Sequence, residues 1–315
     1  MKPHLSFLIL VAVLFGKAAI AQDANPKAVD DRQIKATFEK QLGRLKDEGK
    51  TPDPADLRKQ MEKRKHHALE LPRAQPLNAS RGTAGVYQQR RDSVLCFGNI
   101  YKCDSCNKWH GNIAGGFVIS EDGVAVTNYH VMEAAKAGAF GAMTTDGKVY
   151  QVEEILAASK ADDLAIVKLA GNGFKPAPLV ADTPVGSKVI AITHPQGRFY
   201  SVSEGIISRY YRQSERKGSG PERVAITADF AKGSSGSPVF SENGDVIGVV
   251  ASTNSIYYDR EKDGSQKNLQ MVIKSCIPTR AILNLLSEAK KEKPTEKEEA
   301  PEKKAEPKSE IENKA

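Results

Sequence analysis

The sequence has no long apolar run after Ala21, which argues against a membrane-spanning helix in the mature chain, because such a helix needs about 20 apolar residues. The run from Leu5 to Phe15 is shorter. It follows a lysine and precedes the small residues Ala19-Ile20-Ala21, a pattern typical of a secretory signal. An uncleaved anchor is the alternative. A lipid anchor would need a cysteine directly after the cleavage site, and the residue there is Gln22. We therefore expect residues 1–21 to be a signal peptide and the mature protein to be periplasmic or secreted, without stable membrane insertion.

The sequence also lacks any recognised nucleic-acid-binding motif. It has 46 Lys and Arg against 39 Asp and Glu, a formal net charge of +7. Such a balance raises nucleic acid as a partner, but no aromatic platform accompanies the charge, and an exported protein rarely meets nucleic acid. We interpret the excess as solvated charged surface and expect no nucleic-acid partner.

The two ends of the chain differ from its middle. Residues 22–80 are charged and poor in glycine, and four apolar residues there recur at helical spacing: Ile34, Phe38, Leu42 and Leu45. Asp53-Pro54 is typical of a second helix start. Two amphipathic leader helices are predicted, which pack on the central domain, self-associate or lie on a surface; a loosely helical, solvated leader is the alternative. Residues 288–315 are mostly Lys, Glu and Pro, so we expect them to be disordered.

The central domain, residues 81–287, has a sequence pattern typical of an all-β protein. Short runs rich in Val, Ile, Thr and Tyr alternate with Gly, Asp, Asn and Pro about every ten residues, and no βαβ alternation is visible. The clearer predicted strands are 149–155, 163–169, 188–193, 224–227, 239–240, 246–252 and 270–273. A closing helix is predicted over 277–286. The pattern indicates a barrel or a sandwich.

Glycine and serine crowd one stretch, Gly233-Ser234-Ser235-Gly236-Ser237-Pro238. Glycine adopts dihedral angles that other residues resist, so this stretch can form a tight turn whose N–H groups point one way. If Ser235 is a nucleophile, the N–H groups of Gly233 and Ser235 form the oxyanion hole of an acyl-transfer site. An ordinary turn has the same composition, so the interpretation depends on other motifs.

A serine nucleophile needs a base, and the base needs an orienting group. The pattern over 115–131 predicts two strands joined by a turn, the second of which delivers His130. Asp162 and Asp163 stand at the head of an apolar strand. We assign the orienting carboxylate to Asp163, because strand alternation sends Asp162 the opposite way.

These contexts, Thr127 to Val131, Asp163 to Lys168 and Gly233 to Pro238, resemble the motifs of the trypsin-like (chymotrypsin-fold) serine peptidases. The bacterial secreted branch is most similar, namely the high-temperature-requirement proteases and the glutamyl endopeptidases. Ser203 to Ser208 resembles a strand of the family's second barrel. The resemblance spans roughly 81–287 and implies two antiparallel β-barrels with the three side chains in the cleft between them.

The resemblance implies an exported serine endopeptidase that hydrolyses polypeptide substrates through an acyl-enzyme and needs no cofactor. High-temperature-requirement proteases carry a PDZ domain after the protease. Residues 288–315 are too few to form one, so PDZ-driven assembly is not carried over. The alternative is a catalytically silent trypsin-fold binding module.

By resemblance, the substrate pocket is lined by the segment before the nucleophile and by Val249, Val250, Ala251, Ser252 and Thr253, whose edge can pair with an extended substrate. Asp229 stands six residues before Ser235, where trypsin-type enzymes place an acid that selects Arg or Lys. It also matches, after a shortened loop, an aspartate that bacterial relatives place eight residues before the serine. Ser234 stands where digestive enzymes have the aspartate that pairs with a new N-terminus, so no trypsin-style zymogen activation is expected.

The four cysteines are Cys96, Cys103, Cys106 and Cys276. An even count in an exported protein predicts disulfides, and Cys103–Cys106 with Cys96–Cys276 is one of three possible connectivities. A zinc site of Cys96, Cys103, Cys106 and His110 is a second hypothesis. Free or redox-active thiols are a third, with Cys103 and Cys106 as a thiol oxidoreductase centre.

Overall fold

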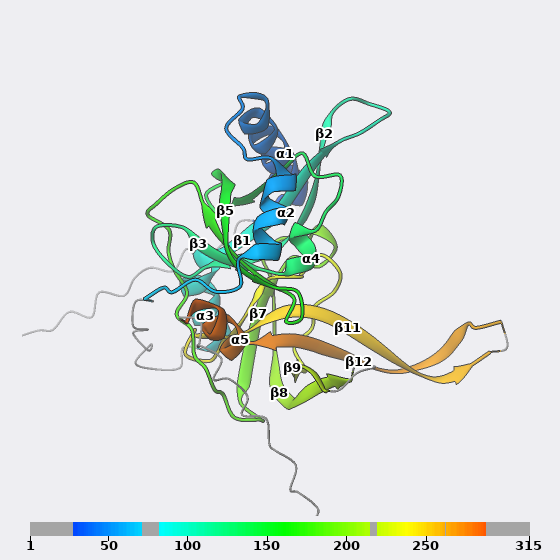
Figure 1. The fold of residues 1–315 in the computed structure, drawn as a ribbon. Helices are drawn as coiled ribbons and strands as arrows, with labels where there is room; N and C mark the ends of the chain where they lie inside the picture. The colour runs from blue at the N-terminus through cyan, green and yellow to red at the C-terminus, as the bar shows by residue number, and fades with distance from the viewer. Residues whose placement is uncertain (1–27, 71–81, 215–218, 262, 288–315) are drawn as a thin grey trace, which may run out of the picture. The chain divides into compact units, whose positions relative to one another are not determined.

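The computed structural model describes residues 28–70, 82–214, 219–261 and 263–287 (Figure 1). The predicted signal peptide and the predicted disordered tail lie outside these residues. From Asp31 onward the described residues form one compact unit, which holds all of the described helices and strands.

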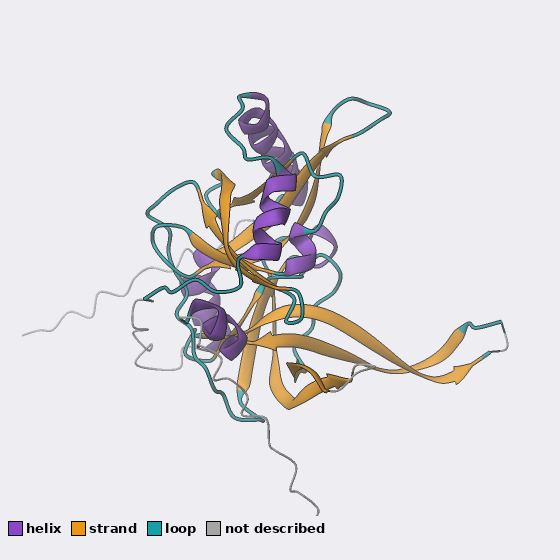
Figure 2. Ribbon diagram, viewed as in Figure 1, coloured by secondary structure: helices purple, strands orange, loops and turns teal. Residues whose placement is uncertain are grey.

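Two closed antiparallel barrels of six strands each form the body of this unit, as expected from the resemblance (Figure 2). The first barrel has the strand order β1-β2-β3-β6-β5-β4. Its strands are β1 (Val94–Lys102), β2 (Trp109–Val118), β3 (Val124–Thr127), β4 (Ala139–Met143), β5 (Val149–Ser159) and β6 (Leu164–Leu169). The second has the order β10-β11-β12-β9-β8-β7. Its strands are β7 (Lys188–Thr193), β8 (Ser201–Ser214), β9 (Ser219–Ile226), β10 (Pro238–Ser241), β11 (Val246–Arg260) and β12 (Gln266–Pro278).

Strand β6 shows how the sequence builds the core. Successive side chains of a strand point to opposite faces, so alternate residues join different apolar clusters. Leu164 and Ile166 belong to a cluster that continues into the second barrel, whereas Ala165 and Val167 belong to one confined to the first barrel and its covering helices. Apolar residues at every position therefore bury both faces of this strand.

The leader helices pack on the first barrel. Helix α1 (Asp31–Asp47) buries Phe38 and Leu42 completely in the cluster shared by the barrels, and helix α2 (Pro54–Lys63) buries Leu57 and Met61 in the other. Helix α2 begins as predicted, with Asp53 capping the Ala55 N–H at 2.7 Å. Of the open alternatives for the leader, the described residues therefore adopt packing on the central domain.

The remaining helices are short. They are α3 (Gly82–Arg90), α4 (Tyr129–Met132) and α5 (Thr279–Leu286), with 3₁₀ turns η1 (Arg91–Ser93) and η2 (Pro195–Gly197). The closing helix starts later than predicted, because Ile277 still pairs with Val249 in the sheet and Pro278 is the N-cap. In the described part of the chain, no helix has both the length and the apolar character that membrane spanning requires.

Strands β11 and β12 extend far beyond the second barrel as a two-stranded arm (Figure 1). The sequence predicted only 246–252 and 270–273 as strands. The outer part reads as polar, yet each strand supplies the other's backbone partners. Four large apolar side chains on the arm are exposed: Ile256, Tyr258, Leu269 and Met271.

Candidate active site

His130 lies on the short helix α4 and not on a strand as predicted. Strand β3 ends at Thr127, and Asn128 keeps an extended backbone before the helix begins. Two hydrogen bonds fix this turn to the loop before β6: the Asn128 side-chain amide and the Tyr129 N–H both donate to the carbonyl of Asp163, at 3.0 and 3.1 Å. The apolar sequence around His130 suits a buried helical turn as well as a strand, which explains the wrong prediction.

Asp163 contacts His130 twice. Its carboxylate oxygens lie 3.0 and 2.9 Å from Nδ1 of the imidazole, and Oδ1 also accepts the backbone N–H of His130 at 3.0 Å. Asp163 has a φ of 62°, a left-handed conformation rare for a residue with a side chain. The neighbouring Asp162 accepts instead from the Ser159 hydroxyl at 2.8 Å. Of the two candidate carboxylates, Asp163 is therefore the one that orients the imidazole.

The hydrogen bond that the His130 imidazole donates to Asp163 raises the pKa of His130 above its ordinary value, against the opposing effect of burial. The imidazole side chain is 47% exposed, so its Nε2 edge can reach a substrate from solvent. With Nδ1–H bonded to the carboxylate, Nε2 is the nitrogen that can accept a proton.

The Ser235 turn is built as its glycines predict. Gly233 has a φ of 96°, and a Cβ there would lie 2.8 Å from the carbonyl oxygen of His194. The Ser234 N–H donates to Ala231 and the Ser237 N–H to Ser234. Among the described residues, none accepts a hydrogen bond from the N–H of Gly233 or of Ser235. Both donors of the expected oxyanion hole are therefore available to a ligand.

The turn lies against the strand that leads to His130. The Gly115 N–H donates to the Ser235 carbonyl at 2.7 Å, and the Thr127 hydroxyl donates to the Gly115 carbonyl at 2.8 Å. Within the described residues the Ser235 hydroxyl makes no hydrogen bond to His130. Such bonds are often long in unliganded enzymes and shorten when substrate binds.

The predicted substrate strand has one edge without a strand partner. Val249 and Val250 are buried and Ala251 partly buried, while Ser252 and Thr253 are exposed. Beyond Val249, strand β10 no longer pairs with β11, so among the described strands only β12 flanks this part of β11. The free edge can take up an extended peptide.

Asp229 is already paired with a cation. Its carboxylate lies 3.2 Å from Nζ of Lys274, and Lys274 also donates to the carbonyl of Phe230 at 2.6 Å. The Asp229 side chain is 87% exposed, whereas that of Lys274 is 14% exposed. Sequence reasoning missed Lys274, because only the register that pairs it with Ile226 brings β12 beside Asp229.

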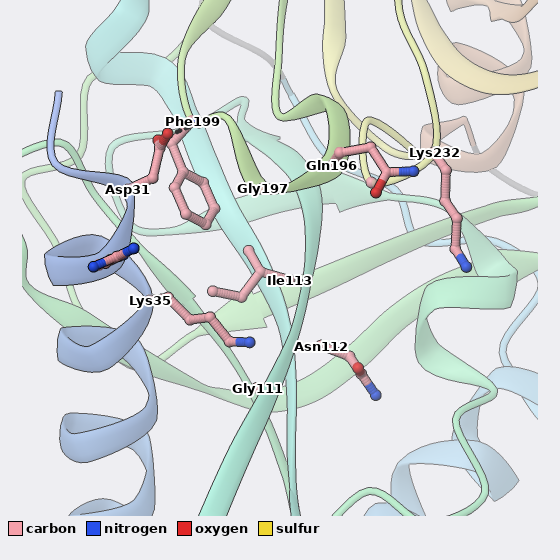
Figure 3. Close-up of a pocket in the computed structure, with 11 residues that line it drawn as sticks. Asp31, Lys35, Gly111, Asn112, Ile113, Gln196, Gly197, Phe199 and Lys232 are labelled. Carbon is pink, nitrogen blue, oxygen red and sulfur yellow. Dashed lines mark hydrogen bonds between the residues drawn. The ribbon is translucent and has the colours of Figure 1, made fainter.

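A cavity of about 630 Å³ adjoins the Ser235 turn at Gly233 (Figure 3). Helix α1, strand β2, the loop after β7 and the turn itself line it: Asp31, Arg32, Lys35, Gly111, Asn112, Ile113, Gln196, Gly197, Phe199, Lys232 and Gly233. Asp31 accepts the Phe199 N–H at 2.9 Å, which fixes the start of α1 at the cavity rim. The leader thus contributes to this cavity, which its sequence gave no sign of.

His194 is structural, as interpreted from the sequence. It is buried, its Nε2 donates to the Leu95 carbonyl at 3.0 Å, and its Nδ1 accepts the Tyr200 N–H at 3.1 Å. Burial lowers the pKa of His194 to about 4. It therefore stays neutral at pH 7.

All four cysteines are free thiols, so the predicted disulfides are absent from the structure. Cys96 lies in the cluster shared by the barrels, 3.5 Å from the Tyr200 hydroxyl, and burial raises its pKa to about 12. Cys276 lies in a separate cluster of the second barrel. The predicted zinc set also loses Cys96, since only Cys103, Cys106 and His110 gather.

Comparison with known proteins points to one family. Residues 114–249 match the model of the trypsin-like peptidase domain. The magnetosome formation protease MamE of Paramagnetospirillum magneticum is 33% identical over 142 residues, which cover 44% of this chain and 20% of MamE. The putative serine protease HhoA of Synechocystis is 30% identical over 199 residues, 58% of this chain and 49% of HhoA.

A probable periplasmic serine endoprotease, DegP-like, of Halomonas elongata is 36% identical over 142 residues, 44% of this chain and 29% of that protein. The match thus spans less than half the length of each of these three relatives. The region that matches the family model, residues 114–249, includes β3, β6 and the Ser235 turn.

Proposed function

We propose that the protein is an exported serine endopeptidase that uses Ser235, His130 and Asp163, because residues 114–249 match the model of the trypsin-like peptidase domain. The observation that carries the proposal is the double contact of the Asp163 carboxylate with Nδ1 and the backbone N–H of His130. This contact holds the imidazole in the tautomer that a general base needs.

In the proposed reaction, the Ser235 hydroxyl attacks the carbonyl carbon of the scissile peptide bond, and its proton passes to Nε2 of His130. The N–H groups of Gly233 and Ser235 stabilise the oxyanion, an interaction for which losing one donor costs about 100- to 1000-fold in rate. His130 then protonates the departing amine, which leaves an acyl-enzyme. Water attacks the ester carbonyl and His130 takes its proton. His130 returns this proton to the Ser235 oxygen as the acyl C–O bond breaks, and the peptide fragment leaves with a new carboxyl terminus. No cofactor is needed.

The two free surfaces near Ser235 suggest how a peptide lies. The acyl side pairs with the edge of Ala251 to Thr253, and the leaving-group side crosses the Ser235 turn toward the cavity beside Lys35. The ion pair with Lys274 neutralises Asp229, so we do not propose a strong preference for Arg or Lys before the scissile bond. Periplasmic action is proposed from residues 1–21 and from the printed name of the Halomonas relative.

The test is covalent labelling with a fluorophosphonate, combined with cleavage of a peptide library. The wild-type protein should be labelled and should cleave, and Ser235→Ala should lose both. Ser234→Ala is the matched control, because its buried hydroxyl has no hydrogen-bond partner and should be dispensable. Folded wild-type protein that is not labelled but binds peptides would support the silent binding module instead.

A further inference from the structure

A cluster of metal-ligating side chains lies at the tip of the β1–β2 hairpin, outside the proposed active site. The Cys103 N–H donates to the Lys108 carbonyl at 3.1 Å, and the Asn107 N–H donates back to the Cys103 carbonyl at 3.0 Å. These bonds fold the loop over, and the pairing of Tyr101 with His110 sets the imidazole beside it. The ligand atoms of Cys103, Cys106 and His110 all lie within 4.8 Å of one another.

This geometry is close to that of a tetrahedral metal site. With bond lengths of about 2.3 Å to sulfur and about 2.0 Å to nitrogen, neighbouring ligands of Zn²⁺ lie roughly 3.5–3.8 Å apart. Sγ of Cys106 is already 3.1 Å from Nε2 of His110. We propose that Cys103, Cys106 and His110 bind Zn²⁺ or a similarly thiophilic divalent cation, with water in the fourth position.

The surroundings of the cluster suit a bound thiolate. The Ser105 hydroxyl lies 3.0 Å from Sγ of Cys103. The ring of Tyr101 packs on the imidazole of His110, with centroids 5.9 Å apart. Outer groups of this kind orient ligands and tune their metal affinity.

The other two thiols provide an internal contrast. Cys96 and Cys276 are buried among apolar side chains of different clusters. No metal can reach them without unfolding the barrels. Stoichiometric binding of a thiophilic cation to the folded chain therefore reports on the hairpin tip.

A bound cation would fasten the hairpin tip to the leader. The adjacent Trp109 packs on helix α1, where a Cβ on Gly43 would lie 2.6 Å from the indole, and its Nε1 donates to Asp47 at 3.2 Å. The metal would fix the loop that precedes Trp109. We expect metal loading to raise the melting temperature of the intact protein.

The experiment is a titration of reduced, full-length protein with Co²⁺, followed by displacement with Zn²⁺. One equivalent of Co²⁺ should give thiolate-to-cobalt charge-transfer and tetrahedral d–d bands, which Zn²⁺ abolishes. Cys103→Ser, Cys106→Ser and His110→Ala should each weaken binding by more than about 100-fold, the upper range for loss of an outer-sphere partner alone. His66→Ala, which removes another exposed histidine, is the control and should leave the spectrum unchanged.

Absence of the bands in reduced, folded protein would overturn the proposal, as would bands that survive in the Cys106→Ser or His110→Ala variant. The readout is a spectrum and does not depend on peptide cleavage. Its failure is thus distinguishable from failure of the proposed peptidase activity.

Discussion

The two barrels share one strand topology but differ in what surrounds them. The first is covered by the leader helices, whose Phe38 and Leu42 are completely buried. The second bears no such cover from the described leader and continues into an exposed arm that carries Met271 and other exposed apolar side chains. The first barrel supplies His130 and Asp163, and the second supplies Ser235. The proposed active site thus combines residues of a barrel that the leader helices cover with a residue of a barrel that they leave uncovered.

The region that matches the family model does not contain all the strands of the two barrels. The matched residues 114–249 begin within β2 and stop within β11. Strand β1 pairs with both β2 and β4, and β12 pairs with both β11 and β9, so each barrel closes only with a strand outside the match. Residues outside the match therefore complete both barrels, and the leader helices cover one of them.

The largest expected effect removes the carboxylate that the first barrel supplies to the proposed active site. Asp163→Asn keeps the side-chain volume but removes the charge that fixes the His130 tautomer, so kcat should fall by about 10⁴-fold. Asp162→Asn, whose carboxylate bonds to Ser159, is the matched control and should retain activity. Kinetics on a cleaved peptide check this. Equal losses in the two variants would show that Asp163 has no special role.

The next prediction tests how much helix α1 contributes to the stability of the first barrel. Phe38→Ala removes a completely buried ring from α1 and should lower the free energy of unfolding by about 3–5 kcal/mol. Met271→Ala on the exposed arm should change it by less than about 0.5 kcal/mol. Denaturant unfolding of both variants makes the comparison. A small effect of Phe38→Ala would mean that the leader is detached in solution.

The two histidines of the barrels should respond oppositely to pH. The pKa of His194, about 4 when folded, lies below its ordinary value of 6.5, so its contribution to stability is complete above pH 6.5 and is lost as the pH falls toward 4. The loss is on the order of 3 kcal/mol. The pKa of His130 is raised, so its contribution is present below pH 6.5 and is lost as the pH rises through the folded value. Denaturant unfolding between pH 4 and 8 (about the range that histidine titrates over) checks both signs.

A variant separates the two histidines. His194→Gln keeps a donor toward the Leu95 carbonyl but cannot gain a proton. It should be less stable at pH 7 and should lose the steep decline of stability on the acid side. An unchanged decline would assign it to other groups.

Local motifs made much of this site predictable from sequence. Ser235 lies on the glycine turn, Asp163 precedes its strand, and both follow from short-range patterns. Interactions between distant segments were not predictable in the same way. The pairing of Lys274 with Asp229 depends on strand register, which the alternation of apolar residues does not specify for exposed hairpins.

The predicted Cys96–Cys276 disulfide is absent from the structure for a related reason. An even number of cysteines was taken as a sign of pairing, but Cys96 and Cys276 occupy buried strand positions in clusters that do not meet. Each thiol is there as a small apolar side chain. For the leader, the sequence predicted the apolar face of the helices, but it did not predict which surface of the central domain that face covers.

A moderate effect is expected in the second barrel, where Lys274 pairs with Asp229. Lys274→Met keeps the apolar stem but frees the exposed carboxylate of Asp229. The ratio of kcat/KM for peptides with Arg rather than Leu before the scissile bond should rise by about 5-fold, the effect of about 1 kcal/mol at an exposed charge. Adding Asp229→Asn should cancel the gain. If the ratio does not move, Asp229 lies outside the substrate pocket.

The smallest effect concerns the cavity that is lined by Arg32 and Lys35 of the leader and by Lys232. These three cations outnumber the one carboxylate of the lining, Asp31, so the cavity should favour peptides with Glu after the scissile bond. Lys35→Glu should lower kcat/KM for such peptides by about 2-fold, as exposed charges contribute little. The effect should vanish at high salt. Lys40→Glu makes the same charge change on α1 outside this cavity, so an equal loss in that variant would attribute the preference to overall charge rather than to the leader's place beside Ser235.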